Sequence, residues 1–321
     1  MFNEIISKLN LDKNAKIVVV HQDDIGVNHG SNLAFEELCG KGFITSGSFM
    51  VNCPWYHEIA EICKANNNLD IGIHLTLTSE YNFYKWRPLS GANRSTGLVD
   101  EHGFFWSTAS KVEQNASKDS VEKELRMQIE TVLNDKIHVS HMDCHMGTAL
   151  SPKFQDIYLE LSKEYKIPAI FPRSWNNYNE VCSGNEVQNK GLEAMEEIDQ
   201  YQYEQKVKDL EASEQFFIID HFAMSPFAKK NENAPLIKKI ITNLKPGITY
   251  LALHCNKSGE IEVIDPEQSH VRIEEYELAK NREFLDWIKT IDNLHLISMH
   301  DIDSIIFLLP TVFVLFLIAV Y

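Results

Sequence analysis

The sequence predicts an α/β fold in which parallel strands, each followed by a helix, curl into a TIM-like (β/α) barrel that is distorted or incomplete. Short apolar runs alternate with amphipathic segments along most of the chain, which is the pattern of repeated β and α units. Polar side chains follow nearly every apolar run, as they do at the carboxyl rim of a barrel, where active sites lie. The length of 321 residues suits one such barrel.

Apolar, often β-branched runs mark the predicted strands. The first run, 16–20, contains isoleucine followed by three valines, and it opens the pattern that later runs repeat. In chain order, the predicted strands span residues 16–20, 43–50, 69–77, 138–142, 168–171, 215–220, 249–253 and 295–298.

Amphipathic segments between these strands mark the helices. Ser31 is a candidate N-cap for the first helix, and Gly40 closes it. In chain order, the predicted helices span residues 31–40, Tyr56–Ala65, 120–134, 153–165, 235–244 and 274–288.

Two stretches do not fit the repeated unit. Residues 79–111 form a long loop that is rich in aromatic residues, and loops of this length in a compact domain are usually functional or disordered. The aromatic residues argue against disorder. Residues 178–213 are acidic, and a helix is expected in their second half. A lid, a dimer contact and plain surface are the interpretations of this whole stretch.

The domain organisation predicted is one barrel over residues 1–303 and an apolar tail over residues 304–321. Residues 305–321 carry no charge and reach only the short end of the length that spans a bilayer. A membrane anchor, a segment docked on the barrel and an end foreign to the fold are the three interpretations of this tail. The N-terminus lacks signal-peptide features, so the expected location is the cytoplasm, with membrane association only through the tail.

Composition narrows the class of partner. The net charge is −16, and an acidic surface repels phosphate backbones, so we expect no nucleic-acid partner. The six cysteines form no CxxC pair, which argues for reduced thiols rather than a structural zinc cluster.

Asp23, Asp24 and His74 are the first candidate site residues. The adjacent aspartates follow the first strand, and like charges side by side are costly unless a cation or a proton separates their roles. One aspartate could bind a metal while the other serves as a general base. The alternative is a helix-capping turn for the aspartates and a hydrogen-bonded core residue for His74.

His141, Asp143 and His145 alternate along the chain, so on a strand their side chains share one face. Three buried polar groups without partners would be expensive, which favours a functional role. Aspartate and histidine together suit one divalent cation, with Zn²⁺ and Mg²⁺ as the candidates.

Two further residues follow predicted strands. His254 could act as a general acid or stabilise a developing oxyanion, and the alternative is a rim histidine bonded to a neighbour. Arg173 could bind substrate or orient a carboxylate, and the alternative is a surface salt bridge.

Taken in order, these motifs resemble the YdjC/ChbG-like carbohydrate deacetylases over roughly residues 15–302. Within this range, the segments 44–46 and 98–105 also resemble that family. The motifs that carry it are Asp23-Asp24-x-Gly26, Gly72-x-His74-Leu75, His141-x-Asp143-x-His145 and the strand ending in His254. The resemblance implies a (β/α) barrel, one divalent cation and removal of the acetyl group from N-acetylated sugars such as chito-oligosaccharides.

The resemblance also implies a role for each site residue. Asp24, His74 and His145 would hold the metal, Asp23 would be the general base, and His254 would support the tetrahedral intermediate. His141 and Asp143 would orient the ligands. Arg173 would neighbour Asp23 or the substrate, and Trp86 with other aromatic residues of the long loop would stack on sugar rings.

The expected function is therefore amide hydrolysis by metal-activated water, with Asp23 as the base and a protonated His254 assisting the leaving amine. Other hydrolases, acting on esters or phosphoesters, remain alternatives. A non-haem iron oxygenase also uses two histidines and a carboxylate, but the helix-rich pattern disfavours its usual fold. The non-enzyme alternative is a degenerate carbohydrate-binding protein, and a homodimer is left open.

Overall fold

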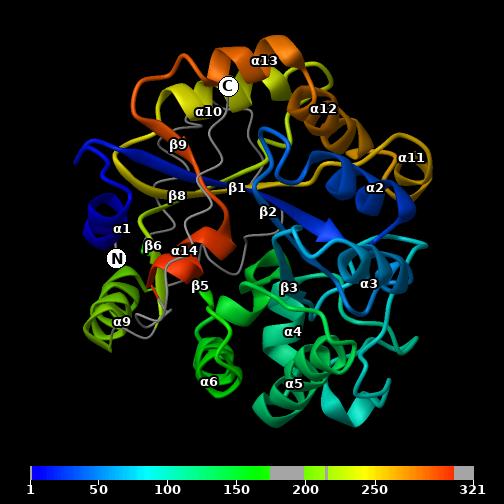
Figure 1. The fold of residues 1–321 in the computed structure, drawn as a ribbon. Helices are drawn as coiled ribbons and strands as arrows, with labels where there is room; N and C mark the ends of the chain where they lie inside the picture. Colours follow the sequence, from blue (N-terminus) through cyan, green and yellow to red (C-terminus); the bar gives the residue numbers. More distant parts are fainter. Residues whose placement is uncertain (1, 174–198, 214–215, 307–321) are drawn as a thin grey trace.

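Seven parallel strands of the described residues pair into one curled sheet at the centre of the molecule, and helices lie around its outside (Figure 1). The computed structural model describes residues 2–173, 199–213 and 216–306. The strands of this part of the chain are β1 (Lys16–Ile25), β2 (Ser46–Phe49), β3 (Ile71–Leu75), β4 (Met142–Cys144), β5 (Ile170–Pro172), β6 (Phe217–Ile219), β7 (His221–Met224), β8 (Gly247–Leu253) and β9 (Leu294–Leu296).

The strand order in the sheet is β4-β3-β2-β1-β8-β7, and β9 pairs with the beginning of β1. A separate parallel pair, β5-β6, is linked to β4 by a bridge between Met142 and Ala169. The backbone N–H of Asp220, between β6 and β7, donates to Ile248 O on β8. This curled, parallel arrangement is consistent with the distorted TIM-like barrel that the sequence predicts.

Each predicted strand is present, with shifted ends, and β7 is an additional one. Its residues follow β6 with only Asp220 between them, so the sequence predicts one strand where the structure has two. Asp220 interrupts the strand because its side chain accepts a hydrogen bond from the backbone N–H of Ile248.

The predicted helices are also present among the described residues, and the segment 274–288 belongs to two helices. Asn281 breaks it, because its side chain caps the second helix by accepting from Phe284 N. The helices are α1 (Phe2–Lys8), α2 (His29–Leu38), α3 (Tyr56–Ala65), η1 (Arg94–Thr96), α4 (Ala109–Asn115), α5 (Lys118–Asn134), η2 (His145–Leu150), α6 (Gln155–Tyr165), α9 (Gln200–Ser213), α10 (Asn233–Thr242), α11 (Glu260–Ile264), α12 (Ser269–Ala279), α13 (Arg282–Ile288) and α14 (Met299–Ile306).

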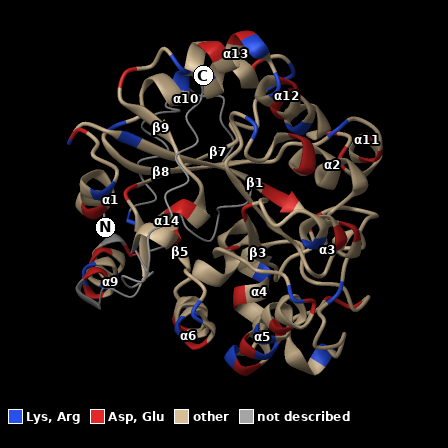
Figure 2. Ribbon diagram, in the orientation of Figure 1, with Lys and Arg blue, Asp and Glu red and all other residues tan. Residues whose placement is uncertain are grey.

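Charged side chains lie mainly on the outer helices, and the end of β1 is an exception (Figure 2). Residues Ile17, Val18, Val19 and Val20 of β1 are at most 1% exposed, because β1 lies between β8 and its other neighbours. Two adjacent carboxylates at the end of so deeply buried a strand need compensation by other polar groups.

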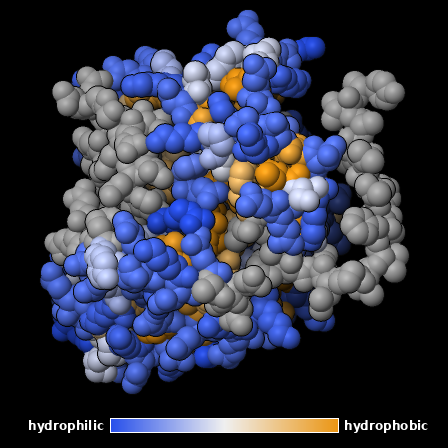
Figure 3. All heavy atoms as spheres, turned by 90° about the vertical axis from the view of Figure 1, so that its left-hand side faces the viewer, coloured by the Kyte–Doolittle hydropathy of each residue, from blue (hydrophilic) through white to orange (hydrophobic). Residues whose placement is uncertain are grey.

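The acidic segment and the tail are described only in part. Helix α9 confirms the helical second half of the acidic segment, whereas residues 178–198 lie outside the described residues, as do residues 307–321 of the tail. The predicted boundary between residues 303 and 304 falls inside α14, which contacts α1. No helix in the described part of the chain combines the length and the apolarity needed to cross a membrane. The face that carries α1 and α9 is mostly hydrophilic, with small apolar patches (Figure 3).

Candidate functional site

A bulge at the end of β1 turns two adjacent aspartates toward the same cavity. The pairing of β1 with β2 shifts register between Gln22 and Ile25, and Asp24 adopts a left-handed backbone with φ 58°. Aspartate tolerates this conformation better than most residues. Neighbouring strand residues normally point to opposite faces, so the bulge is what brings Asp23 and Asp24 to one side.

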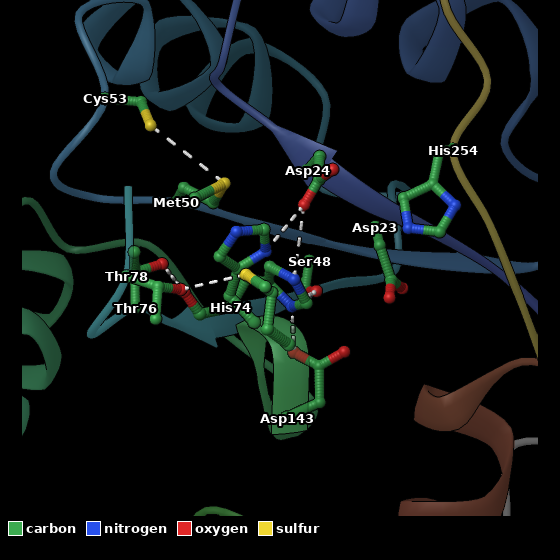
Figure 4. A network of polar contacts seen from close by, with 12 residues as sticks. Asp23, Asp24, Ser48, Met50, Cys53, His74, Thr76, Thr78, Asp143 and His254 are labelled. Carbon is green, nitrogen blue, oxygen red and sulfur yellow. Dashed lines mark hydrogen bonds and ion pairs between the residues drawn. The ribbon is translucent and has the colours of Figure 1, made fainter. Parts of the chain in front are cut away.

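The cavity has a volume of about 340 Å³ and lies at the carboxyl ends of β1, β3, β4 and β8. Asp24 points toward His74, and the side chains of Asp23 and His254 face the same space (Figure 4). The acidic and basic residues that line it are Asp23, Asp24, His74, Glu80, Asp143, His145, His254, Asp265 and Arg272. The location agrees with the rim position expected for a parallel α/β fold.

Asp24, His74 and His145 offer three ligand atoms within 4.8 Å of one another. Asp24 Oδ1 lies 3.4 Å from His74 Nε2 and 3.1 Å from His145 Nδ1. Donor atoms bound at about 2.0–2.1 Å to one tetrahedral zinc ion would lie about 3.3 Å apart. Asp24 Oδ1 is buried, and none of the described residues forms a well-formed hydrogen bond with it. The residues therefore fit a divalent cation.

The far side of each histidine ring contacts a carboxylate. His74 Nδ1 lies 2.9 Å from Asp143 Oδ1, and His145 Nε2 lies 3.0 Å from Glu80 Oε2. Such carboxylates fix the orientation and tautomer of metal-binding histidines. Glu80 was not predicted from the sequence, because it lies in the irregular loop after β3 and no spacing links it to His145.

These carboxylates dominate the electrostatics of both rings. Burial alone would lower the pKa of His74, but Asp143 and Asp24 outweigh it and raise that pKa well above its usual value. Burial likewise opposes the effect of Glu80 and Asp24 on His145, whose pKa rises to about 9. The site is therefore strongly negative around its two imidazoles.

Arg272 is the cation that compensates Asp24. Its Nη1 lies 2.8 Å from Asp24 Oδ2, its side chain is 7% exposed, and its Nη2 donates to the hydroxyl of Tyr81. Burial raises the pKa of Asp24, but Arg272 and His145 overcome this effect and hold that pKa well below its usual value. Arg272 lies in the middle of α12, where no sequence pattern distinguishes it from a surface arginine.

Replacing Arg272 with methionine is expected to destabilise the metal-free protein by about 3–5 kcal/mol, because it leaves the buried Asp24 carboxylate without its cation. Denaturant unfolding in the presence of EDTA measures the change. Arg126→Met is the matched control, since Arg126 pairs with Glu122 and Glu164 on the surface and should contribute about 1 kcal/mol or less. Equal losses in the two variants would contradict the assignment.

Asp23 lies at one end of a buried series of hydrogen-bonded side chains. Its Oδ1 lies 2.6 Å from His21 Nδ1, and His21 Nε2 lies 2.9 Å from His141 Nε2. His141 Nδ1 contacts Ser140 Oγ at 2.8 Å, and Ser140 donates to Asp70. His21, His141 and Asp143 could also group around an ion, but both ring nitrogens of His21 and His141 already have hydrogen-bond partners. This series of hydrogen-bonded side chains therefore fixes the orientation of the Asp23 carboxylate.

His254 lines the cavity, but its surroundings disfavour the protonated form of its imidazole. The ring is buried, and burial lowers its pKa to about 4, although Asp24 acts in the opposite direction. Its Nδ1 lies 2.7 Å from Ser225 Oγ. A neutral imidazole is therefore the form present near pH 7, in contrast to the protonated acid expected from the sequence.

The structure does not bring Arg173 or Trp86 to the cavity. Arg173 forms ion pairs with Glu211 and Asp220, which matches the surface salt bridge considered as its alternative. Trp86 is 3% exposed, and its Nε1 donates to Thr78 O, so it belongs to the core beneath His145. Of the aromatic residues in this loop, Tyr81 is the one among the described lining residues.

Comparison with known proteins identifies sequence relatives. The family model described as YdjC-like protein matches residues 17–290. A carbohydrate deacetylase of Thermus thermophilus is 29% identical over 171 residues, which cover 53% of this chain and 59% of that protein. One of Oceanobacillus iheyensis is 31% identical over 51% of this chain and 69% of its own length. The chain thus matches 59% of the Thermus relative's length.

A solved structure has a similar fold. A protein of Enterococcus faecalis V583, described as a cellobiose-phosphate cleavage protein, superposes with a TM-score of 0.65 over 90% of this chain and 99% of its own. The two sequences are 20% identical, so the likeness concerns the fold.

Proposed function

This chain belongs to the YdjC-like protein family, and from that premise we propose that it is a metal-dependent hydrolase that removes acetyl groups from N-acetylated carbohydrates. The observation that carries the proposal is the buried Asp24 Oδ1, which lies near ring nitrogens of His74 and His145. Within the described part of the chain, this oxygen has no well-formed hydrogen bond. The relatives named carbohydrate deacetylase suggest the substrate class.

Asp24, His74 and His145 would hold the ion, with Asp143 and Glu80 fixing the two rings. When bound, a divalent cation supplies Lewis-acid chemistry, lowering the pKa of a water molecule and withdrawing electron density from the acetyl carbonyl. Two imidazoles and one carboxylate form a set typical of zinc, whereas magnesium prefers oxygen ligands and retains waters.

Asp23 would act as the general base. His21 Nδ1 forms a hydrogen bond with one carboxylate oxygen of Asp23, and the Asp23 side chain is 14% exposed at the cavity. A carboxylate fixed in this way can accept a proton from the attacking water without reorienting. The series of buried hydrogen bonds beyond His21 fixes the His21 ring and, through it, the orientation of the Asp23 side chain.

The lining of the cavity favours a neutral sugar. Its described acidic residues are Asp23, Asp24, Glu80, Asp143 and Asp265. Arg272, the arginine among the described lining residues, is already paired with Asp24, so little positive charge remains for a phosphate group. The lining of the cavity also includes Phe222, Met224 and Phe227, which can pack on the apolar face of a sugar ring.

The proposal predicts acetate release from N-acetylglucosamine oligomers that is abolished by EDTA and restored by Zn²⁺ or Mg²⁺. The full chain is assayed with oligomers of several lengths, and metal content is measured in parallel. Stoichiometric metal without acetate release would contradict deacetylation of these sugars and point to other amides or esters. Absence of both metal and activity would favour a carbohydrate-binding protein.

A further inference from the structure

Two buried polar side chains lie behind His254, on the side away from the cavity. Ser225 Oγ is 2.7 Å from His254 Nδ1, and Glu275 Oε2 accepts a hydrogen bond from the backbone N–H of His254 at 2.6 Å. The Ser225 hydroxyl also interacts with the Glu275 carboxyl. Ser225 is fully buried and Glu275 is 1% exposed. The three side chains thus form a path from the cavity into the protein.

Three separate elements hold this path in place. Ser225 follows β7, and its backbone N–H donates to Ala252 O on β8. His254 follows β8 directly, and Glu275 comes from the middle of α12. The arrangement is therefore set by the packing of α12 on the ends of two paired strands.

Glu275 is in surroundings that favour a protonated carboxyl group. Burial raises its pKa to about 7, against the opposing effects of Ser225, the His254 N–H and Arg272, while Asp23 on β1 adds to the increase. Cys255, next to His254, also faces this carboxyl. Glu275 Oε1 has no well-formed hydrogen bond with any residue that the structure describes, whereas Oε2 has one. A proton on this carboxyl group would be available to the Ser225 hydroxyl, which interacts with it.

We propose that Glu275, Ser225 and His254 form a proton relay that supplies the leaving amine during deacetylation. The inference rests on the proposed function, and it answers how a neutral imidazole can serve as the acid. His254 enters the reaction with its proton on Nε2, facing the cavity, and with Nδ1 accepting from Ser225.

The relay is balanced in protons. As the carbon–nitrogen bond of the acetamide breaks, the amine nitrogen takes the proton from His254 Nε2. In the same step Ser225 gives its hydroxyl proton to His254 Nδ1, and the Glu275 carboxyl group gives its proton to Ser225 Oγ. Glu275 ends as a carboxylate, and His254 then carries its proton on Nδ1. The path is reset when a proton equivalent to the one that Asp23 received from water enters at His254 Nε2 from the cavity, and the protons on Nδ1 and Ser225 Oγ move back toward Glu275.

The test compares two acetylated substrates in the metal-loaded full chain carrying Ser225→Ala or Glu275→Gln. One substrate is an N-acetylglucosamine oligomer, whose amine must be protonated to leave, and the other is p-nitrophenyl acetate, whose phenolate leaves without a proton. The relay predicts that kcat for the amide falls by about 10²-fold or more, while kcat for the ester stays within about threefold. Glu274→Gln is the matched control, because Glu274 precedes Glu275 on α12 and bonds Asn231 and Asn233 instead.

A pH profile gives a second readout. The wild-type rate on the amide should decline as pH rises through about 7, because Glu275 loses the proton that the relay requires, and the ester rate should not. Parallel losses on both substrates in the two variants would show a merely structural role and overturn the relay, as would unchanged amide rates. A wild-type protein that hydrolyses the ester but not the sugar overturns the proposed function itself, and the relay with it.

Discussion

Replacing His145 with asparagine is expected to abolish stoichiometric metal binding and to lower kcat/KM for acetate release by about 10³-fold or more. Loss of the ion removes several kcal/mol of stabilisation of the transition-state charge, and each 1.36 kcal/mol corresponds to about a tenfold change in rate. The change leaves the ion pair between Asp24 and Arg272 intact, so the fold should persist. Metal content after dialysis and steady-state kinetics are the two measurements.

His29→Asn is the matched control for that experiment. His29 also pairs with a carboxylate, Glu58, at 2.7 Å, but its side chain is 45% exposed and it is not among the residues lining the cavity. The control should keep both metal and activity. A folded His145 variant that retains one equivalent of metal and normal acetate release would refute the assigned ligand set.

Replacing Asp23 with asparagine is expected to lower kcat by about 10²–10⁴-fold while metal content stays unchanged. The amide cannot accept a proton from water, which removes general-base catalysis. The separation of the two effects matters, because Asp23 and Asp24 are adjacent and only Asp24 is assigned to the metal. Kinetics and metal analysis on the same preparation measure both quantities.

Asp286→Asn controls for the loss of one carboxylate, since Asp286 lies on the surface and pairs with Lys289. Its activity should equal that of the wild type. If Asp23→Asn instead loses the metal, Asp23 is a ligand and the division of roles between the two aspartates is wrong.

Much of the fold follows from local patterns in the sequence. Apolar runs mark eight of the nine described strands, and helix α3 has the bounds predicted from its apolar spacing. These features depend on neighbours in the chain, so they can be recognised from a short window. The break at Asp220 and the capping of α13 by Asn281 depend on single side-chain hydrogen bonds, which the apolar pattern does not reveal.

Local patterns in the sequence are enough to predict the parallel α/β plan and the convergence of Asp24, His74 and His145 at strand ends. The completion of the site, in contrast, depends on contacts between segments that are distant in the chain. The bulge in β1 directs Asp23 and Asp24 to the same cavity, although regular strand alternation would separate them. Arg272, Glu80 and Glu275 reach their partners from distant elements, and Arg173 pairs elsewhere. The physical reason is that strand order and helix packing, rather than sequence spacing, set which charges are buried together.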